Sequence, residues 1–102
     1  MSTLHTVNKS PFDGTSLSSA LGLALPGDAV LLIEDGVVGA RKGSSAAKAI
    51  EASLASCKVY VLGPDVAARG MKAEDLVSGV ESVDYAGFVD LAANHARTQS
   101  WL

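Results

Sequence analysis

The chain of 102 residues lacks several features that would each point to a particular class of protein. Its one cysteine, Cys57, cannot form an internal disulfide. A single cysteine fits a reducing compartment and leaves open a reactive thiol or an intermolecular bond. Eight basic residues stand against eleven acidic ones, with a net charge of −3, and they are scattered along the chain. Direct binding of nucleic acid by this chain alone is therefore not expected.

The chain also lacks long apolar runs. None approaches the roughly 18 residues that a membrane-spanning helix needs. The first ten residues contain His5, Asn8 and Lys9, in place of the basic start and apolar block of a signal peptide. We therefore expect a cytoplasmic protein that does not associate with membranes. The 48% apolar content is ordinary for a folded domain, and the length predicts one domain over residues 1–102.

The segment DAVLLIEDG at 28–36 predicts the central strand of this domain. Five apolar residues follow one another at 29–33 without alternation, which is typical of a strand covered on both faces of a parallel sheet. Ligands of open parallel sheets bind outside the carboxyl ends of the strands. Glu34 and Asp35, directly after the predicted strand, are therefore the first place to look for function.

Strands and helices alternate along the rest of the chain. Further strands are predicted at 3–7, 58–62 and 80–83, and the tail 97–102 fits an edge strand. The residues expected to cap the three main helices are Asp13 or Ser16, Ser44 or Ser45, and Asp84. This order predicts an α/β fold, a three-layer sandwich with a mostly parallel sheet of four or five strands.

Two smaller expectations concern the second half of the chain. Gly63-Pro64-Asp65 has the composition of a turn and is expected to separate the third strand from a short helix at 66–69. In the last helix the buried stripe is expected to consist of residues at helical spacing, namely Tyr85, Phe88, Val89 and Ala92.

Four carboxylates are expected near strand ends, namely Glu34, Asp35, Asp65 and Asp84. Together they suggest a Mg²⁺ site of the receiver or phosphotransfer type, which is the enzyme alternative. However, no glycine-rich phosphate loop follows any strand, and Asp65 and Asp84 are explained equally well as a turn former and a helix cap. The favoured expectation is that the chain holds no metal and no cofactor.

Cys57, the catalytic candidate, is expected at the start of the third strand. A sulfur-carrying thiol needs access and a lowered pKa, and the neighbouring Lys58 points to the opposite face of the strand. Cys57 is therefore predicted to be inert and partly buried. His5 is predicted to be a hydrogen-bonded structural residue, and His95 to interact with the last carbonyls of a helix.

The single tryptophan, Trp101, stands beside Leu102 at the end of the sequence. A large aromatic residue at a chain end is expected to be held either by its own sheet or by a partner chain. Trp101 and Leu102 are therefore the interface candidates.

Five segments in order resemble the DsrH/TusB family, whose members are small subunits of sulfur-relay complexes. They are LHTVNKSPF at 4–12, DAVLLIEDGV at 28–37, VYVLGPDVAARG at 59–70, VDYAGFVDL at 83–91 and QSWL at 99–102. The resemblance covers nearly the whole chain. It implies a DsrE/F/H-like α/β fold and assembly with a DsrE/TusD-like and a DsrF/TusC-like subunit, as a dimer of heterotrimers that hands persulfide sulfur to a downstream acceptor protein.

One position departs from part of the family. Members from sulfur-oxidising bacteria carry a cysteine in the first helix where this chain has Ala20, and a methyl group cannot carry a persulfide. The resemblance therefore implies a supporting subunit of a sulfurtransferase complex, whose partner supplies the working cysteine. It leaves two pathways open, 2-thiolation of the wobble uridine of tRNA and dissimilatory sulfur oxidation. The competing hypothesis is a stand-alone enzyme or carrier that uses Cys57 or the carboxylate crevice.

Overall fold

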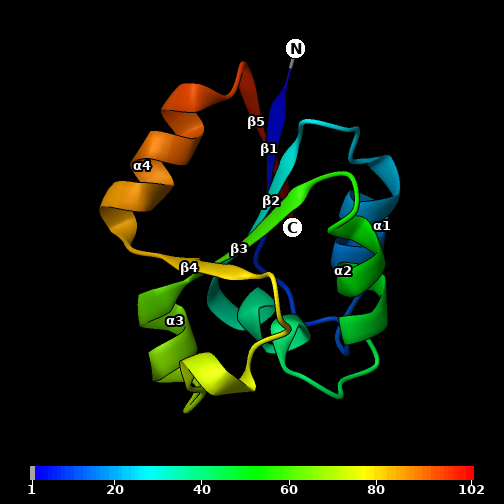
Figure 1. Cartoon of the computed structure of the whole chain (residues 1–102), viewed down its shortest axis with the longest axis vertical. Coiled ribbons are helices and arrows are strands. Elements are labelled where there is room, and N and C mark those ends of the chain that lie inside the picture. The colour runs from blue at the N-terminus through cyan, green and yellow to red at the C-terminus, as the bar shows by residue number, and fades with distance from the viewer. Residues whose placement is uncertain (1) are drawn as a thin grey trace.

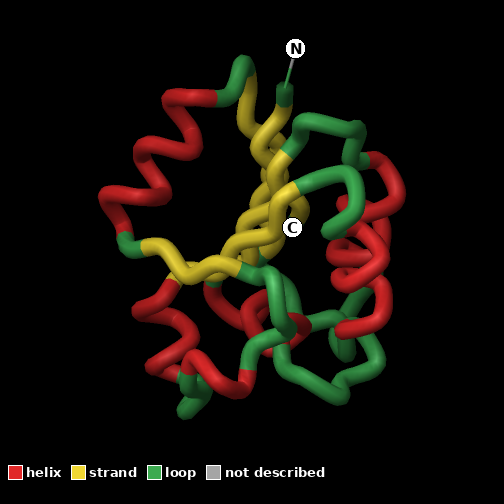
Figure 2. The backbone as a smooth tube through the Cα atoms, viewed as in Figure 1, coloured by secondary structure: helices red, strands yellow, loops and turns green. Residues whose placement is uncertain are grey.

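A computed structural model describes residues 2–102 (Figure 1). Strands, α-helices and two short 3₁₀ helices, η1 and η2, alternate along the chain, as Figure 2 shows by colour. The elements are β1 (Thr3–Val7), α1 (Ser16–Leu23), β2 (Ala29–Leu32), η1 (Glu34–Ala40), α2 (Ala47–Ser53), β3 (Lys58–Leu62), α3 (Gly63–Ala68), η2 (Ala73–Asp75), β4 (Glu81–Val83), α4 (Tyr85–Asn94) and β5 (Arg97–Trp101).

The five strands form one sheet in the order β4-β3-β2-β1-β5, and every pair is parallel. β2 lies at its centre and is buried along its whole length, which confirms the interpretation of 28–36. The tail forms the edge strand β5, in which Thr3 pairs with Arg97 and Val7 with Trp101. Both the α/β class and the mostly parallel sheet are confirmed.

The sheet lies between two helical layers of unequal size. Figure 1 shows α1 and α2 on one side of the sheet and α4 alone on the other. The main core lies on the side of α1, α2 and η1, where Val7, Val30 and Leu32 pack against Leu17 and Ile50. α3 and the 3₁₀ helices gather at the carboxyl ends of the strands, where Figure 1 shows them below the sheet.

The α4 side has a thinner core. Leu4, Ala29 and Leu31 are its buried residues, and no residue of α4 itself is fully buried. The predicted apolar stripe of this helix is partly wrong, because Tyr85 and Val89 are 60% and 67% exposed. The residues of α4 that pack against the sheet are Phe88, Leu91 and Ala92. The helix is thus rotated so that Leu91 faces the sheet in place of Val89.

The cap predictions had mixed outcomes. Asp84 caps α4 as expected, because its Oδ1 accepts the Gly87 amide hydrogen at 2.8 Å. The predicted caps of the other two helices are wrong, since Thr15 and Ala46 occupy the N-cap positions without a side-chain hydrogen bond. The hydroxyl groups expected to cap them donate to carbonyls elsewhere, Ser16 to Leu102 and Ser44 to Gly39.

The turn predicted at 63–65 is also wrong. Gly63, Pro64 and Asp65 form the first turn of α3, which follows β3 without a loop. Proline is tolerated there because its missing N–H would have no intrahelical partner. None of the helices within residues 2–102 has the length and apolar character to cross a membrane.

Candidate functional site

The turn after β2 meets the start of α3 at the carboxyl edge of the sheet. The amide of Glu34 donates to Oδ2 of Asp65 at 2.7 Å, and Glu34 adopts a left-handed backbone conformation with φ of 51°. Arg69 donates to Oδ1 of Asp35 at 2.9 and 3.1 Å, and its Nη1 lies 3.9 Å from Oδ1 of Asp65. Asp35 and Asp65 are therefore held around one guanidinium and already have a cation as partner.

The fourth carboxylate does not join this group. Asp84 lies at the β4–α4 junction, where it caps the helix. Among residues 2–102, no group of three or more acidic, histidine or cysteine side chains is placed to hold a metal ion. The described carboxylates thus do not form the Mg²⁺ crevice of the enzyme alternative. The sequence did not indicate that Arg69 would organise them, because the contact joins residues 34 positions apart.

Backbone segments approach closely at the same edge of the sheet. The Ile33 amide donates to the Val7 carbonyl at 3.0 Å, and a Cβ at Gly36 would overlap that same carbonyl oxygen. Asn8 follows β1 here, and its Oδ1 is buried without a hydrogen-bond partner among the described residues. Beside the ends of β1 and β2, the carboxyl edge is therefore closed by backbone packing.

Cys57 lies at the other end of the sheet, directly before β3. Its side chain is buried, and its thiol donates to the carbonyl of Ser53 at 3.4 Å. Burial raises the pKa of the Cys57 thiol above its ordinary value, and the negative charge of Asp28 adds to this effect. The nucleophilic species is the thiolate, and a raised pKa together with burial disfavours it.

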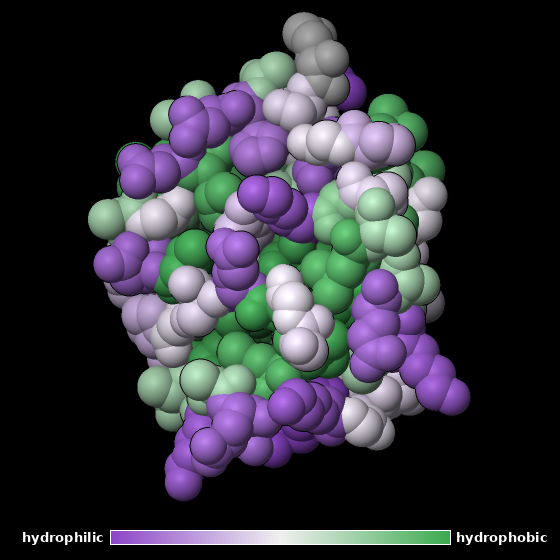
Figure 3. All heavy atoms as spheres, viewed as in Figure 1, coloured by the Kyte–Doolittle hydropathy of each residue, from purple (hydrophilic) through white to green (hydrophobic). Residues whose placement is uncertain are grey.

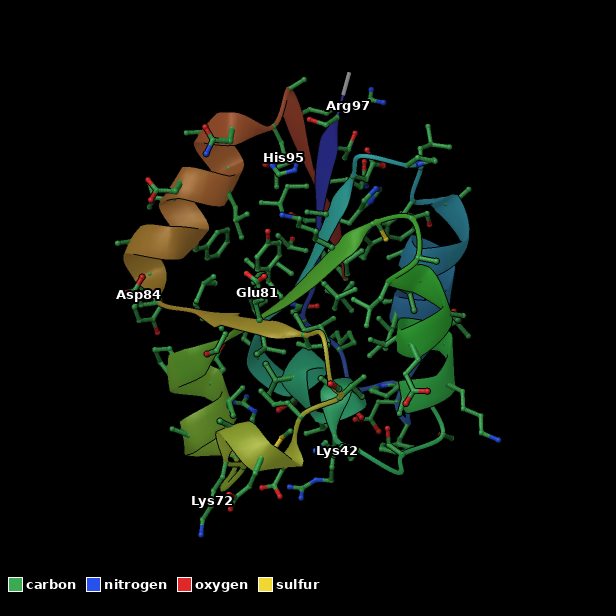
Figure 4. All side chains as sticks on the ribbon, viewed as in Figure 1. Lys42, Lys72, Glu81, Asp84, His95 and Arg97 are labelled. Carbon is green, nitrogen blue, oxygen red and sulfur yellow. The ribbon has the colours of Figure 1, made fainter. Side chains whose placement is uncertain are left out.

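Cys57 also lines a cleft of about 480 Å³ at this end of the sheet, together with Lys58, Tyr60 and His95. Figure 4 shows His95 pointing from the end of α4 into the space beside the sheet, while Lys42 and Lys72 lie at the opposite end of the molecule. His95 Nδ1 lies 2.7 Å from the Leu91 carbonyl, which confirms its predicted interaction with the end of the helix. Figure 3 shows this face of the molecule, with apolar residues in its centre and hydrophilic ones around them.

A buried polar chain joins β1, the start of β2 and β5. Nε2 of His5 lies 3.0 Å from Oδ2 of Asp28, and Nε1 of Trp101 donates to Nδ1 of His5 at 3.1 Å. Asp28 also accepts the amide hydrogens of Thr3 at 2.9 Å and Leu25 at 3.0 Å. The prediction that His5 is a hydrogen-bonded structural residue is confirmed.

These contacts hold Trp101 in its own sheet. The indole lies beside the imidazole with ring centroids 6.1 Å apart, and the side chain is half-buried. Leu102, by contrast, is 82% exposed. Asp28 is the residue that sequence reasoning missed. The sequence offered one indication of its contact with His5: an aspartate stands directly before a strand predicted to be buried, and a histidine lies within the first strand.

Ala20, the position at which the family resemblance implies a cysteine in some members, lies on the buried face of α1 and is fully inaccessible to solvent. It belongs to the main core together with Leu17 and Val37. The side chain at this position therefore faces the protein interior.

Comparison with known proteins identifies the family. A sequence model described as "DsrH like protein" matches residues 9–98. The chain belongs to the DsrH family. Among curated members it is 37% identical over 98 residues to Protein TusB of Pectobacterium parmentieri and 35% identical to Protein TusB of an Escherichia coli strain, with 96% of this chain and 99% of each relative covered. The DsrH/TusB resemblance is thereby confirmed.

Solved structures show the same fold. The ychN protein of E. coli superimposes with a TM-score of 0.77 at 16% identity, covering 98% of this chain and 99% of that one. A protein of unknown function, MTH1491 from Methanobacterium thermoautotrophicum, also gives a TM-score of 0.77 at 16% identity, covering 96% of this chain and 97% of that one. These likenesses show that the two proteins share the α/β fold of this DsrH family member over nearly its whole length.

Proposed function

We propose that this chain is a supporting subunit of a cytoplasmic sulfur-relay complex. The family match and the TusB relatives support the membership. The observation that carries the supporting role is the state of Cys57, the only thiol in the chain. Its sulfur is buried, donates to the Ser53 carbonyl and has a raised pKa. Each of these properties opposes the formation of an accessible thiolate.

The proposed chemistry takes place on sibling subunits. A persulfide on a DsrE/TusD-like chain is attacked at its outer sulfur by the thiolate of a downstream acceptor protein. A new bond forms between the acceptor sulfur and the transferred sulfur, the bond between the two donor sulfurs breaks, and the donor cysteine leaves as a thiolate. This chain and a DsrF/TusC-like chain shape the complex around that donor, in a dimer of heterotrimers.

We assign the complex to 2-thiolation of the wobble uridine of tRNA. The name TusB of the curated relatives supports this branch over dissimilatory sulfur oxidation, and so does Ala20, which replaces the cysteine of the sulfur oxidisers. The scattered basic residues and net charge of −3 support contact with protein partners in place of the tRNA itself.

To test whether this chain belongs to a sulfur-relay complex, it is co-expressed with both sibling subunits, and the native masses of the purified species are measured. The expected result is a defined hetero-oligomer that contains all three chains. The complex is then treated with a persulfide donor, and the intact mass of each chain is measured. One added sulfur is expected on a sibling and none on this chain.

A Cys57→Ala variant is the matched control. A complex built with this variant should load sulfur to the same extent as the wild-type complex. Sulfur found on Cys57, or loading that disappears with the variant, would refute the supporting role. A chain that does not associate with the siblings would refute the membership of the complex.

The pathway is tested separately in cells. A strain that lacks this chain should lose 2-thiouridine from its tRNA, as measured by mass spectrometry of nucleosides. Both the wild-type gene and the Cys57→Ala gene should restore the modification. Normal thiolation in the deletion strain would count against the tRNA branch.

A further inference from the structure

The imidazole of His5 is hydrogen-bonded at both ring nitrogens, and this leaves no place for a second proton. Nε2 lies 3.0 Å from Oδ2 of Asp28, and Nδ1 accepts the indole hydrogen of Trp101 at 3.1 Å. Because an indole N–H can only donate, Nδ1 carries no hydrogen in this structure. A proton added to Nδ1 would face the Trp101 N–H. Protonation of His5 and its bond to Trp101 therefore exclude each other.

The carboxylate of Asp28 favours the protonated ring. Burial acts in the opposite direction, but the hydrogen bonds to this carboxyl lower its pKa from 3.8 to about 2. It is therefore ionised between roughly pH 8 and pH 5, the range in which histidine side chains take up protons. A buried imidazolium is costly unless an opposite charge compensates it. Asp28 can provide that charge while it keeps its hydrogen bonds from the Thr3 and Leu25 amides.

Few other charges face the ring of His5. α1 contacts β1 and contains no charged residue. Among the described residues that line the groove beside His5, only Asp28 and Arg97 are charged. Arg97 donates to the Thr3 hydroxyl at 3.0 Å, and its positive charge opposes protonation of His5. Cys57, near Asp28, is a neutral thiol because burial raises its pKa. The charge in direct contact with the ring is thus the negative one.

Solvent can reach the ring once the indole has moved. His5 lines a groove of about 340 Å³ together with Leu23, Leu25 and Trp101. The two leucines are 63% and 64% exposed, so the groove opens to solvent. Water in the groove can accept the hydrogen of a protonated Nδ1 in place of the contact with Trp101.

Trp101 can leave its place without disruption of the sheet. It is the last residue of β5, where it pairs with Val7 at the end of β1. Leu102, which follows it, is 82% exposed and is bonded through its carbonyl to the Ser16 hydroxyl. The pairs that residues 97–100 form with β1 do not involve the indole. Strand ends open at little cost in free energy, so release of this end is the local response to protonation.

We propose that His5 and Trp101 form a pH-sensitive switch, in which a proton taken up from solvent at Nδ1 of His5 releases Trp101 and Leu102 while the rest of the sheet stays paired. Only hydrogen bonds break, and no covalent bond changes. The released form holds one proton more than the closed form, so acid favours release and a return to neutral pH closes the switch. This inference goes beyond the proposed function and does not depend on it, because it concerns the folded chain itself.

The fluorescence of Trp101 tests the switch directly, because it is the single tryptophan of the chain. Emission spectra and the NMR signal of the indole N–H are recorded on the full-length chain from about pH 8 to about pH 4. We expect one reversible step with the slope of a single proton. In this step the emission moves to longer wavelength, and the indole hydrogen loses its protection from exchange with solvent. Circular dichroism over the same range should stay constant.

His5→Gln is the decisive variant. Its amide can donate to Asp28 and accept from Trp101, but it takes up no proton in this range, so the step should be absent. His95→Gln is the matched control at the other histidine, and it should show the wild-type step. A wild-type emission that stays constant, or that changes only together with the circular dichroism, overturns the proposal. A step that persists in folded His5→Gln overturns it as well.

A reciprocal measurement does not depend on the folding of His5→Gln. In Trp101→Phe the competing donor is gone, so the imidazole of His5 should take up its proton at a higher pH than in the wild type. The ring signals of His5 in NMR spectra follow this uptake in both chains. Equal titration of His5 in the two chains would show that its protonation and the contact with Trp101 are independent, which overturns the switch.

Discussion

The imidazole of His5 donates a hydrogen bond of 3.0 Å to the buried carboxylate of Asp28. The direction follows from Trp101, whose indole nitrogen can only donate and therefore requires an unprotonated Nδ1 on His5. The ring proton is thus on Nε2, facing Asp28. Three strands that are distant in sequence meet in this contact, so it ties the edge strand β5 to the centre of the sheet.

Stability should fall in acid because of Asp28. Burial alone raises the pKa of this carboxyl, but the hydrogen bonds from the Leu25 amide, from His5 and from the Thr3 amide outweigh it and lower the pKa from 3.8 to about 2. A lowered pKa stabilises the folded state above pH 3.8, and this contribution is lost as the pH falls through about 2. The expected loss between pH 5 and pH 2 is about 2 kcal/mol, measured by urea unfolding.

The Asp28→Asn variant isolates this contribution. An amide in the same position turns an N–H group toward donors and leaves the buried network incomplete, which should cost about 3 kcal/mol at pH 7. The difference between variant and wild type should shrink below pH 4, because the Asp28 carboxyl of the unfolded wild-type chain takes up a proton there before that of the folded chain does. If the difference in unfolding free energy between variant and wild type stays constant from pH 7 to pH 2, the acid dependence of stability does not come from the Asp28 carboxyl.

Trp101 should stabilise the fold through its indole N–H. Trp101→Phe keeps an aromatic ring and removes the donor to His5, which should lower the free energy of unfolding by about 1 kcal/mol. Leu102→Ala is the matched control, because Leu102 is 82% exposed and its change should stay within about 0.5 kcal/mol. In NMR spectra the indole proton of the wild type should exchange slowly with solvent. Rapid exchange would show that the hydrogen bond to His5 is not formed in solution.

Strand positions and the order of elements were predictable because apolar runs and turn residues are local signals. The first and third strands have the bounds that the sequence indicated, and the long apolar run at 29–33 lies at the centre of the sheet. The helix caps were less predictable, because serines near a helix start can donate to other carbonyls, as Ser44 does.

The polar contacts could not be predicted because they depend on strand order. His5 and Asp28 become neighbours only because β1 and β2 are adjacent, and Trp101 joins them only because β5 lies on the other side of β1. Arg69 reaches Asp35 across the junction of η1 and α3 in the same way. The sequence contains each of these residues but not the register that brings them together.

The thiol of Cys57 should react slowly in the native protein. It is buried, and its raised pKa leaves little thiolate at pH 7. Labelling with an aromatic disulfide reagent should be limited by opening of the structure and should accelerate in urea below the unfolding transition. Ser56→Cys in a Cys57→Ala background is the matched control, because Ser56 is exposed and should react like a free cysteine. Equal native rates for the two chains would contradict the buried position of Cys57.

Two glycines should respond in opposite ways to the same added methyl group. Gly36 lies against the carbonyl of Val7, and its Cβ would overlap that oxygen, so Gly36→Ala should force the backbone at the carboxyl edge apart and cost at least about 2 kcal/mol. Gly22 lies in α1 with nothing within 4 Å of its added Cβ, so Gly22→Ala should stabilise the helix by about 0.5 to 1 kcal/mol. Chemical unfolding of the two variants measures both changes. If Gly36→Ala and Gly22→Ala have similar free energies of unfolding, the backbone of β1 and the turn after β2 can move apart with little loss of stability, which would contradict the prediction.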